Sequence, residues 1–275
     1  MPALDAHISA LFVYPIKSCR GIALREARLG ARGLLHDREW MVVDERGRFL
    51  TQREHPRLAR IETELTATNL RLTTAGMPAL VIALAARSAV RLAVQVWNHQ
   101  GEAEDGGEEA ARWLTQAIGS AARLVRAPQQ MPREANALYR GATPAPINFP
   151  DGYPILICNT ASLADLNARM GTDGPVPMSR FRPNIVVDGW PAYEEDRLQQ
   201  LDIGGVRLRL VKACTRCATT TVDQLTGKLA ANPLPHLKAY RFDKALLGVT
   251  FGQNAVIESG IGADLRVGEA IHARA

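Results

Sequence analysis

Alternating hydrophobic and polar positions dominate the first hundred residues, and a period of two is typical of short strands separated by turns. Residues 39–52 predict a hairpin around a tight turn at residues 45–47. The other strands that this pattern predicts cover residues 7–14, 22–29, 58–65, 69–73 and 90–97.

The period changes to that of a helix between residues 105 and 119, where apolar side chains recur three and four positions apart. Asp105 is expected to cap the beginning of this helix, and Gly119 is expected to end it. A strand over residues 121–126 should follow. The predicted apolar face of the helix consists of Ala110, Trp113, Leu114, Ala117 and Ile118.

A proline-rich stretch, residues 127–150, contains five of the chain's 16 prolines and is the expected boundary between two regions. Strands outnumber helices on both sides of it, and strand and helix do not alternate regularly. The pattern therefore predicts a mainly β (α+β) protein of barrel or sandwich architecture with peripheral helices. Beyond the boundary, strands are expected over residues 184–187, 206–212, 251–258 and 265–273, and helices over 160–170 and 235–240.

The composition adds constraints on partners and location. The longest apolar run, residues 77–86, is half the length that a membrane span needs, and the first residues do not form a secretory signal. We therefore expect a cytoplasmic protein without a membrane partner. The net charge of +5 comes from arginines scattered among acidic residues rather than from a basic tract. This argues against a nucleic-acid polymer as partner and suits an anionic small molecule.

Cys214 and Cys217 form a Cys-x-x-Cys pair in the sequence CTRCATTTVD, and the pair has several interpretations. A zinc site would need two more ligands, for which the lone His236 is the nearby candidate. A thioredoxin-like dithiol should open a helix, whereas three consecutive threonines favour a strand. One cysteine could instead be a soft ligand to a redox metal held mainly by a non-protein group, or both could be buried structural thiols.

Basic and hydroxyl side chains near predicted strand ends are candidate phosphate contacts. Arg180 and Arg182 are expected on the same side of an extended segment, where two guanidinium forks suit phosphate oxygens. Lys17 and Ser18 follow a proline at a strand end and offer a point charge beside a hydroxyl. Arg38 lies between two acidic residues, so a local ion pair is its simplest interpretation. Cys158, in the apolar run ILIC, is expected to be a buried structural thiol.

Ten blocks, in this order along the chain, give the sequence a specific resemblance. They are YPIKSCRG, HDREWMVVDERG, LTQREHPRLARI, SLADLN, FRPNIVV, CTRCATTTVD, TG, PL, FGQN and VGE. In these blocks the chain resembles the MOSC family, named for the C-terminal domain of molybdenum cofactor sulfurase, and within it the mitochondrial amidoxime reducing component and its bacterial relatives. The resemblance implies an N-terminal β-barrel domain over residues 4–126 and a MOSC β-barrel domain over residues 131–273.

The same resemblance implies that Cys217 coordinates molybdenum in a Mo-molybdopterin cofactor. Asn254 replaces a tyrosine of the animal proteins, which puts its contact in doubt, and Gly152 and Tyr153 replace small hydroxyl residues, so backbone contacts alone would survive there. The positions that match the family's cofactor contacts are Lys17, Ser18, Arg38, Arg182, Asn184, Thr215, Arg216 and Asn254.

The implied activity is the two-electron reduction of small N-hydroxylated compounds, such as amidoximes and N-hydroxylated bases, with release of water. Some bacterial relatives carry an iron–sulfur domain that this sequence lacks. The expected partner is therefore a separate electron donor of ferredoxin, flavin or cytochrome b5 type. The absence of a mitochondrial targeting sequence suits a bacterial cytoplasmic protein.

Two other functions remain compatible with the sequence. A cofactor carrier or sulfur-handling protein would use Cys217 as ligand or persulfide site, and the same thiol would be required. A cofactor-free binding module would hold no metal. Pyridoxal phosphate could form a Schiff base with Lys17, but no feature of the sequence calls for it.

Overall fold

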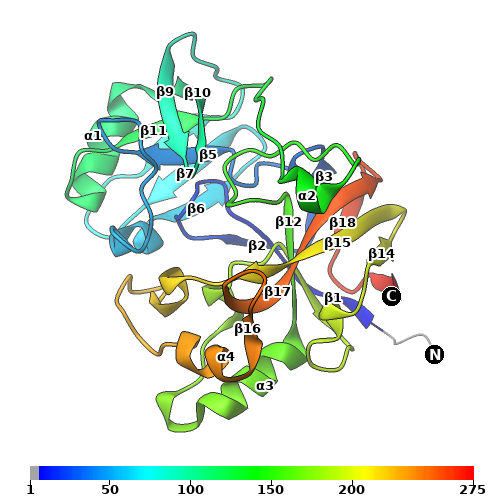
Figure 1. The fold of residues 1–275 in the computed structure, drawn as a ribbon. Helices are drawn as coiled ribbons and strands as arrows, with labels where there is room; N and C mark the ends of the chain where they lie inside the picture. Colours follow the sequence, from blue (N-terminus) through cyan, green and yellow to red (C-terminus); the bar gives the residue numbers. More distant parts are fainter. Residues whose placement is uncertain (1–5) are drawn as a thin grey trace.

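The computed structural model describes residues 6–275 and shows two lobes built mainly from strands (Figure 1). The mainly β architecture with few helices, predicted from the sequence, is confirmed. Residues 4 and 5, at which the predicted N-terminal domain begins, lie outside the described residues. Within residues 6–275, no helix combines the length and the apolar character needed to cross a bilayer.

The lower lobe in Figure 1 is a closed barrel. Seven strands form a ring, which closes because its first and last members, β12 and β17, are themselves paired. Two short strands pair with ring strands near their ends: β2 (Ile22–Leu24) with β1, and β16 (Phe242–Asp243) with β17. The order around the ring is β12 (Ile155–Asn159), β13 (Ile185–Asp188), β1 (Ala6–Val13), β19 (Ala270–Arg274), β14 (Gln200–Ile203), β15 (Val206–Thr215) and β17 (Gly248–Ser259).

The alternation of buried and outward-facing residues that fills the barrel interior is clearest in β15. In β15, Val206, Leu208 and Leu210 are buried, whereas Arg207 and Arg209 point outward and pair with carboxylates of β14 and β17. Each buried aliphatic side chain of this kind contributes roughly 1.5–3 kcal/mol. Aliphatic residues from all seven strands form one core cluster, so the barrel is a filled core rather than a pore.

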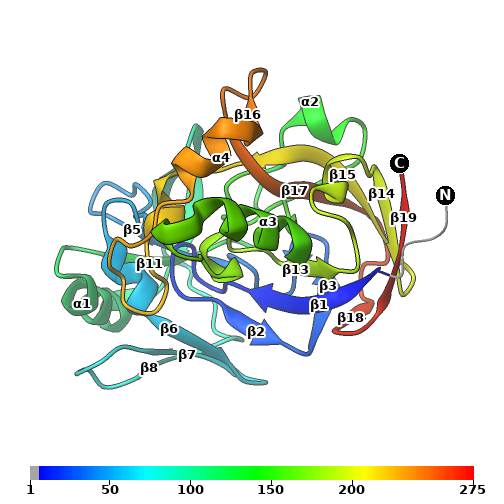
Figure 2. The same ribbon diagram turned by 90° about the horizontal axis from the view of Figure 1, so that it is seen from below.

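Strand β1 belongs to this barrel although it comes first in the chain. It pairs with β13 (His7↔Asp188) on one side and with β19 (Ala6↔Ile271) on the other. Most of the upper lobe is therefore formed by chain between β1 and β12, including α1 (Gly107–Ile118), which lies at the left of Figure 2.

One strand–helix–strand unit interrupts the otherwise antiparallel ring. Strands β12 and β13 are parallel, and α3 (Thr160–Met170) connects them. The helix has the bounds expected from the sequence, whereas the strand over ILIC was not predicted. Asn159 caps the helix by accepting a hydrogen bond from the backbone of Ala161 at 3.1 Å. Cys158 lies in β12 and is fully buried, as expected.

The upper lobe combines small antiparallel sheets with α1 (Gly107–Ile118). The predicted face of α1 is buried, and Gly119 ends the helix in the left-handed conformation. Asp105 does not cap it, because its carboxylate pairs with Arg123 at 2.8 Å instead. Its sheets contain β5 (Trp40–Val43), β11 (Arg123–Arg126), β10 (His99–Asp105) and β9 (Arg91–Val96); and β6 (Glu62–Leu65), β7 (Asn69–Thr73) and β8 (Leu80–Ala83). A third small sheet, β18 (Asp264–Arg266), β3 (Glu26–Gly30) and β4 (Gly33–Leu34), packs against the barrel core instead.

The strand predicted over residues 58–65 is wrong in its first half. Residues 56–60 form a 3₁₀ turn, which Pro56 favours at its first position, and β6 starts at Glu62. The remaining short helical elements are α2 (Ala137–Arg140), α4 (Leu234–Arg241) and the 3₁₀ turns Gly171–Asp173, Met178–Arg180, Glu194–Asp196 and Ala218–Thr221.

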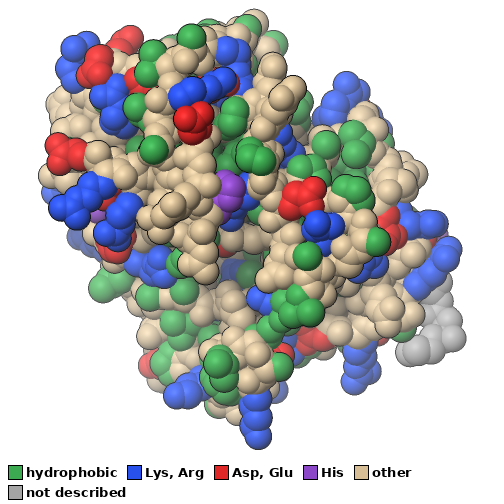
Figure 3. All heavy atoms as spheres, turned by 45° about the horizontal axis from the view of Figure 1, so that its top comes forward, with side chains coloured by type: hydrophobic (Ala, Val, Ile, Leu, Met, Phe, Trp, Pro, Cys, Tyr) green, Lys and Arg blue, Asp and Glu red, His purple; other side chains and the backbone are tan. Residues whose placement is uncertain are grey.

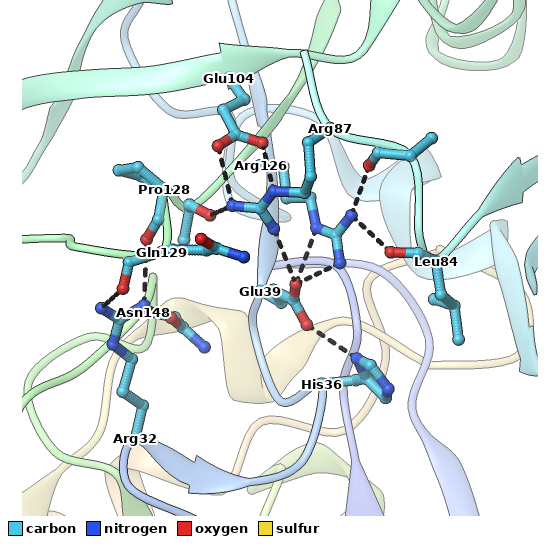
Figure 4. Close-up of polar contacts among 12 residues, drawn as sticks. Arg32, His36, Glu39, Leu84, Arg87, Glu104, Arg126, Pro128, Gln129 and Asn148 are labelled. Atoms are coloured by element: carbon cyan, nitrogen blue, oxygen red, sulfur yellow. Dashed lines mark hydrogen bonds and ion pairs between the residues drawn. The ribbon is translucent and has the colours of Figure 1, made fainter. Parts of the chain in front are cut away.

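A charged network holds the start of β5 to the end of β11 (Figure 4). The Glu39 carboxylate accepts a hydrogen bond from Arg126 Nε at 2.7 Å and lies 2.8 Å from His36 Nδ1. Burial opposes the ionisation of Glu39, but the hydrogen bond with His36 and the charge of Arg126 outweigh it and lower the pKa of Glu39. Beside the network, Arg32, in the turn between residues 30 and 33, binds carbonyls of the proline-rich stretch and so fixes that stretch to this turn.

We expect Glu39→Gln to lower the free energy of unfolding at pH 7 by about 1–3 kcal/mol, because charged donors would lose their carboxylate. Since the native pKa of Glu39 lies below its ordinary value of 4.5, the stabilisation exists above pH 4.5 and disappears as the pH falls through the native pKa. Urea unfolding between pH 3 and 7 should show the gap to wild type closing in acid. Glu45→Gln, at an exposed glutamate, is the control; a gap that stays constant with pH would contradict this role.

Candidate functional site

A cleft of about 390 Å³ lies where the two lobes meet, and Figure 3 shows the recess between them. Both lobes line it. The structure brings all nine site residues expected from the resemblance to this cleft: Lys17, Ser18, Arg38, Arg182, Asn184, Thr215, Arg216, Cys217 and Asn254.

Cys217 is exposed in the cleft, directly after the end of β15. Its Sγ lies 3.4 Å from Thr219 Oγ1. The three threonines that follow do not form the expected strand; residues 218–221 form a 3₁₀ turn instead. Thr220 explains the difference, because its hydroxyl donates to the carbonyl of Cys217 at 3.0 Å and its backbone N–H donates to the same oxygen.

Two interpretations of the Cys-x-x-Cys pair do not fit this geometry. A zinc site would need further ligands, but among residues 6–275 no three His, Cys, Asp or Glu side chains come together for a metal, and His236 pairs with Asp173. A thioredoxin-like dithiol would place its first cysteine at the start of a helix. Here Cys214 lies in strand β15, and Cys217 precedes only a four-residue turn.

Arg216 points back from the cysteine loop into the protein. Its guanidinium donates to Cys214 Sγ at 2.7 Å and to the carbonyl of Phe181. The backbone N–H of Arg216 binds the Val249 carbonyl at 2.8 Å, which anchors the loop to β17. The loop is thus held from both its backbone and its charged side chain, while the Cys217 thiol stays free.

Arg180 and Arg182 both reach the cleft, but not from an extended segment as expected. Residues 178–180 form a 3₁₀ turn, and Arg182 has a positive φ of 54°. Arg180 is 3% exposed and donates to Thr220 O and to Asp223. Arg182 donates to Cys19 O at 2.8 Å and thereby bridges the two lobes.

Tyr14 is a site residue that the sequence did not reveal. The guanidinium carbons of Arg38 and Arg182 lie 4.2 and 4.3 Å from the centre of its ring. Arg38 also pairs with Asp37 at 2.6 Å, the local ion pair expected from the sequence, and binds Asn184 Oδ1 at 3.2 Å. Burial lowers the pKa of Arg182 to about 10, so a neighbouring anion would favour its charged form.

Lys17 lies three residues after Tyr14 and also lines the cleft. It is 6% exposed, and its Nζ lies 3.0 Å from the carbonyl of Phe149 and 2.5 Å from Asp151. Ser18 follows with a positive φ of 71°, and its hydroxyl binds Leu50 O at 3.3 Å. Asp151 was also missed, because it contacts Lys17 only through folding across 134 positions of sequence.

The other expected contacts also lie on the barrel side of the cleft. Asn254 Nδ2 donates to Lys212 O at 3.2 Å, which engages its amide within the barrel wall. Gly152 leaves open space where a side chain would be, and Tyr153 is largely buried with an unpaired hydroxyl. Thr215 ends β15 with its side chain exposed.

Unpaired donors show what this cleft is suited to hold. Among residues 6–275, Arg180 Nε, Arg182 Nη2 and Arg216 Nε are buried without a hydrogen-bond partner. Buried donors of this kind are costly and are rarely left unpaired in folded proteins. All three atoms belong to arginines that line the cleft, and the exposed Cys217 lines the same cleft. The donor set therefore fits an anionic, oxygen-rich ligand bound next to a soft sulfur ligand.

The upper lobe contributes an aromatic wall that sequence reasoning did not find. Trp97 lies at the tip of the β9–β10 hairpin, 5.1 Å from Phe49 between ring centres, and the Arg53 guanidinium lies 5.0 Å from its ring. Trp97 has a positive φ of 52°, which costs such a bulky residue roughly 1–3 kcal/mol. The residues with positive φ that line the cleft are Ser18, Arg38, Trp97 and Arg182.

Comparison with known proteins identifies relatives over most of the chain. Residues 5–121 match the MOSC N-terminal beta barrel domain, and residues 144–272 match the MOSC domain. Mitochondrial amidoxime reducing component 2 of Bos taurus is 38% identical over 85% of this chain and 72% of its own length. Mitochondrial amidoxime-reducing component 1 of Homo sapiens is 36% identical over 96% and 82%. Molybdenum cofactor sulfurase of Danio rerio is 30% identical over 88% of this chain but 31% of its own length.

The burial of the four thiols predicts their reactivity with a thiol reagent such as Ellman's reagent. Cys217 is exposed and Cys214 is half-buried, whereas Cys19 and Cys158 are fully buried and burial raises the pKa of Cys19 to about 12. In native protein produced in a molybdenum-free host, we expect up to two thiols to react, and four after denaturation. Cys217→Ser should remove the faster native phase; an unchanged fast phase would contradict the exposure of Cys217.

Proposed function

Because this chain belongs to the MOSC family, with an N-terminal β-barrel domain followed by a MOSC domain, we propose that it holds a Mo-molybdopterin cofactor and reduces N-hydroxylated compounds. The observation that carries the proposal is the cleft itself. It presents one exposed thiol, Cys217, together with buried arginine N–H donors that have no protein partner.

Different residues of the cleft would bind different parts of the cofactor. Cys217 Sγ supplies the soft ligand to the metal. Arg182, Arg38 and Lys17 supply positive charge and N–H donors to the phosphate and the ring heteroatoms of the pterin. The stacking of both guanidinium groups on Tyr14 fixes their positions before any ligand binds, which lowers the cost of ordering them.

When bound, the cofactor supplies the two-electron redox chemistry at which an N–O bond is reduced. The overall reaction converts the N-hydroxylated compound, two electrons and two protons into the amine, amidine or base and one water. The protein must bind the compound beside Cys217, keep competing water out and deliver protons. The two electrons come from a separate donor protein of ferredoxin, flavin or cytochrome b5 type.

A cofactor carrier or sulfur-handling protein is the second candidate. The relationship to a molybdenum cofactor sulfurase supports it, since the match covers 88% of this chain. The exposed Cys217 thiol would serve a persulfide as well as a metal ligand. That relative is much longer than this chain, whereas the amidoxime reducing components correspond to it over most of their own length, and this favours the reductase.

Metal analysis of purified protein is the first test. Protein produced in a molybdenum-sufficient host should contain close to one molybdenum per chain, and Cys217→Ser should lose at least about ninety per cent of it, because the soft ligand is removed. Cys214→Ser is the matched control from the same motif and should retain the metal. Equal molybdenum in wild type and Cys217→Ser would sink the cofactor assignment.

Turnover then separates the two candidates. Loaded wild-type protein with a reduced dye as electron source should reduce benzamidoxime to benzamidine, and the dye should be oxidised in a 1:1 ratio of electron pairs to product. Loaded protein that oxidises no dye in the presence of benzamidoxime would favour the carrier.

A further inference from the structure

The backbone conformation of Trp97 is unusual for such a bulky residue. The β9–β10 hairpin turns through two residues, 97 and 98, and its first position has a positive φ. Glycine, asparagine or aspartate are the residues that suit such a position. A tryptophan there is strained, and 41% of it remains exposed, so burial in the core does not compensate the strain. An observed strain of this kind points toward a functional cause.

Three contacts set the indole in one place. Its Nε1 donates to Asp151 Oδ1 at 3.0 Å, its ring is tilted 56° to that of Phe49, and Arg53 covers it from a third side. Asp151 is the same carboxylate that binds Lys17. The tip of the upper lobe is therefore tied to the polar part of the cleft, and the indole has a fixed orientation.

The positive charge of Arg53, next to Trp97, also has no carboxylate partner among the described residues. Arg53 Nε donates a long hydrogen bond of 3.5 Å to Thr51 Oγ1. Within residues 6–275, no carboxylate forms an ion pair with the Arg53 guanidinium. Arg53 is exposed at the cleft edge. Phe49, Arg53 and Trp97 thus give the cleft a wall that is aromatic on its surface and cationic at its rim. None of the three is a cofactor contact implied by the family resemblance.

We propose that Phe49, Arg53 and Trp97 form the substrate-selecting wall of this cleft, which favours planar conjugated N-hydroxylated compounds with an anionic substituent over aliphatic ones. The inference rests on the proposed reductase function and assigns the selectivity of the same site. A planar ring gains stacking on the exposed indole, which an aliphatic amidoxime does not. A carboxylate on the far side of that ring would meet the unpaired Arg53.

Competition between two amidoximes tests the aromatic part. Trp97→Ala should lower kcat/KM for benzamidoxime about tenfold relative to acetamidoxime, the loss expected for one stacked ring. Trp97→Phe keeps a ring and should recover most of the preference. Phe242→Ala, at a half-exposed aromatic outside the cleft, is the matched control and should leave the ratio unchanged. An equal fall for both substrates, or loss of molybdenum in Trp97→Ala, would overturn the selecting role.

A substituent series tests the cationic rim. Arg53→Gln should lower kcat/KM for 4-carboxybenzamidoxime several-fold more than for benzamidoxime, and the wild-type preference should weaken with added salt. Arg46→Gln is the control, at an exposed arginine of the same lobe outside the cleft. If both substrates respond equally to Arg53→Gln, the assignment of the rim is wrong.

Binding without turnover keeps this inference separable from the proposed function. The other tryptophans, Trp40, Trp113 and Trp190, are 1–7% exposed, so quenching at the long-wavelength edge of the emission reports Trp97. Oxidised wild-type protein titrated with benzamidoxime should show saturable quenching that Trp97→Phe lacks. If wild type shows no turnover of any substrate, the reductase proposal fails, and quenching still supports the wall. Absence of both quenching and selectivity overturns the wall.

Discussion

Two half-buried arginines whose guanidinium groups share one aromatic ring set the geometry of the cleft. Arg38 and Arg182 stack on Tyr14, and Asp37 neutralises only one of them. Like charges at this separation repel strongly when water is excluded, so the arrangement is stable only where the surrounding chain holds it and favours an added anion. Arg182 also bonds to Cys19 and Gln224, which come from different lobes. The contact between the lobes and the positive charge of the cleft are thus produced by the same side chains.

The sequence predicts the strand periodicity well because alternation is a local property. Strand β15 and helices α1 and α3 follow it closely. The local predictions that proved wrong also have physical causes. The threonines after Cys217 have a high strand propensity, yet hydroxyl-to-backbone bonds close a 3₁₀ turn. Asp105, a good cap by type, is engaged by Arg123.

The site was predictable where the resemblance supplied ordered motifs, since all nine expected residues line one cleft. Tyr14, Asp151 and Trp97 were missed because each acquires its role through contacts across tens to more than a hundred positions. Trp97 carried one local signal, a bulky residue where a hairpin must turn, and it was assigned to the end of a strand instead. Backbone strain of this kind is visible only once the register of the hairpin is known.

The pairing of β1 with β19 has a consequence for biosynthesis. The barrel cannot close until residues 270–274 have left the ribosome, although its first strand is made at the start. During translation the upper lobe has its own cores and can condense early, while β1 waits with an unsatisfied edge. A nascent chain would therefore expose the edge of β1 to chaperones until residues 270–274 had emerged.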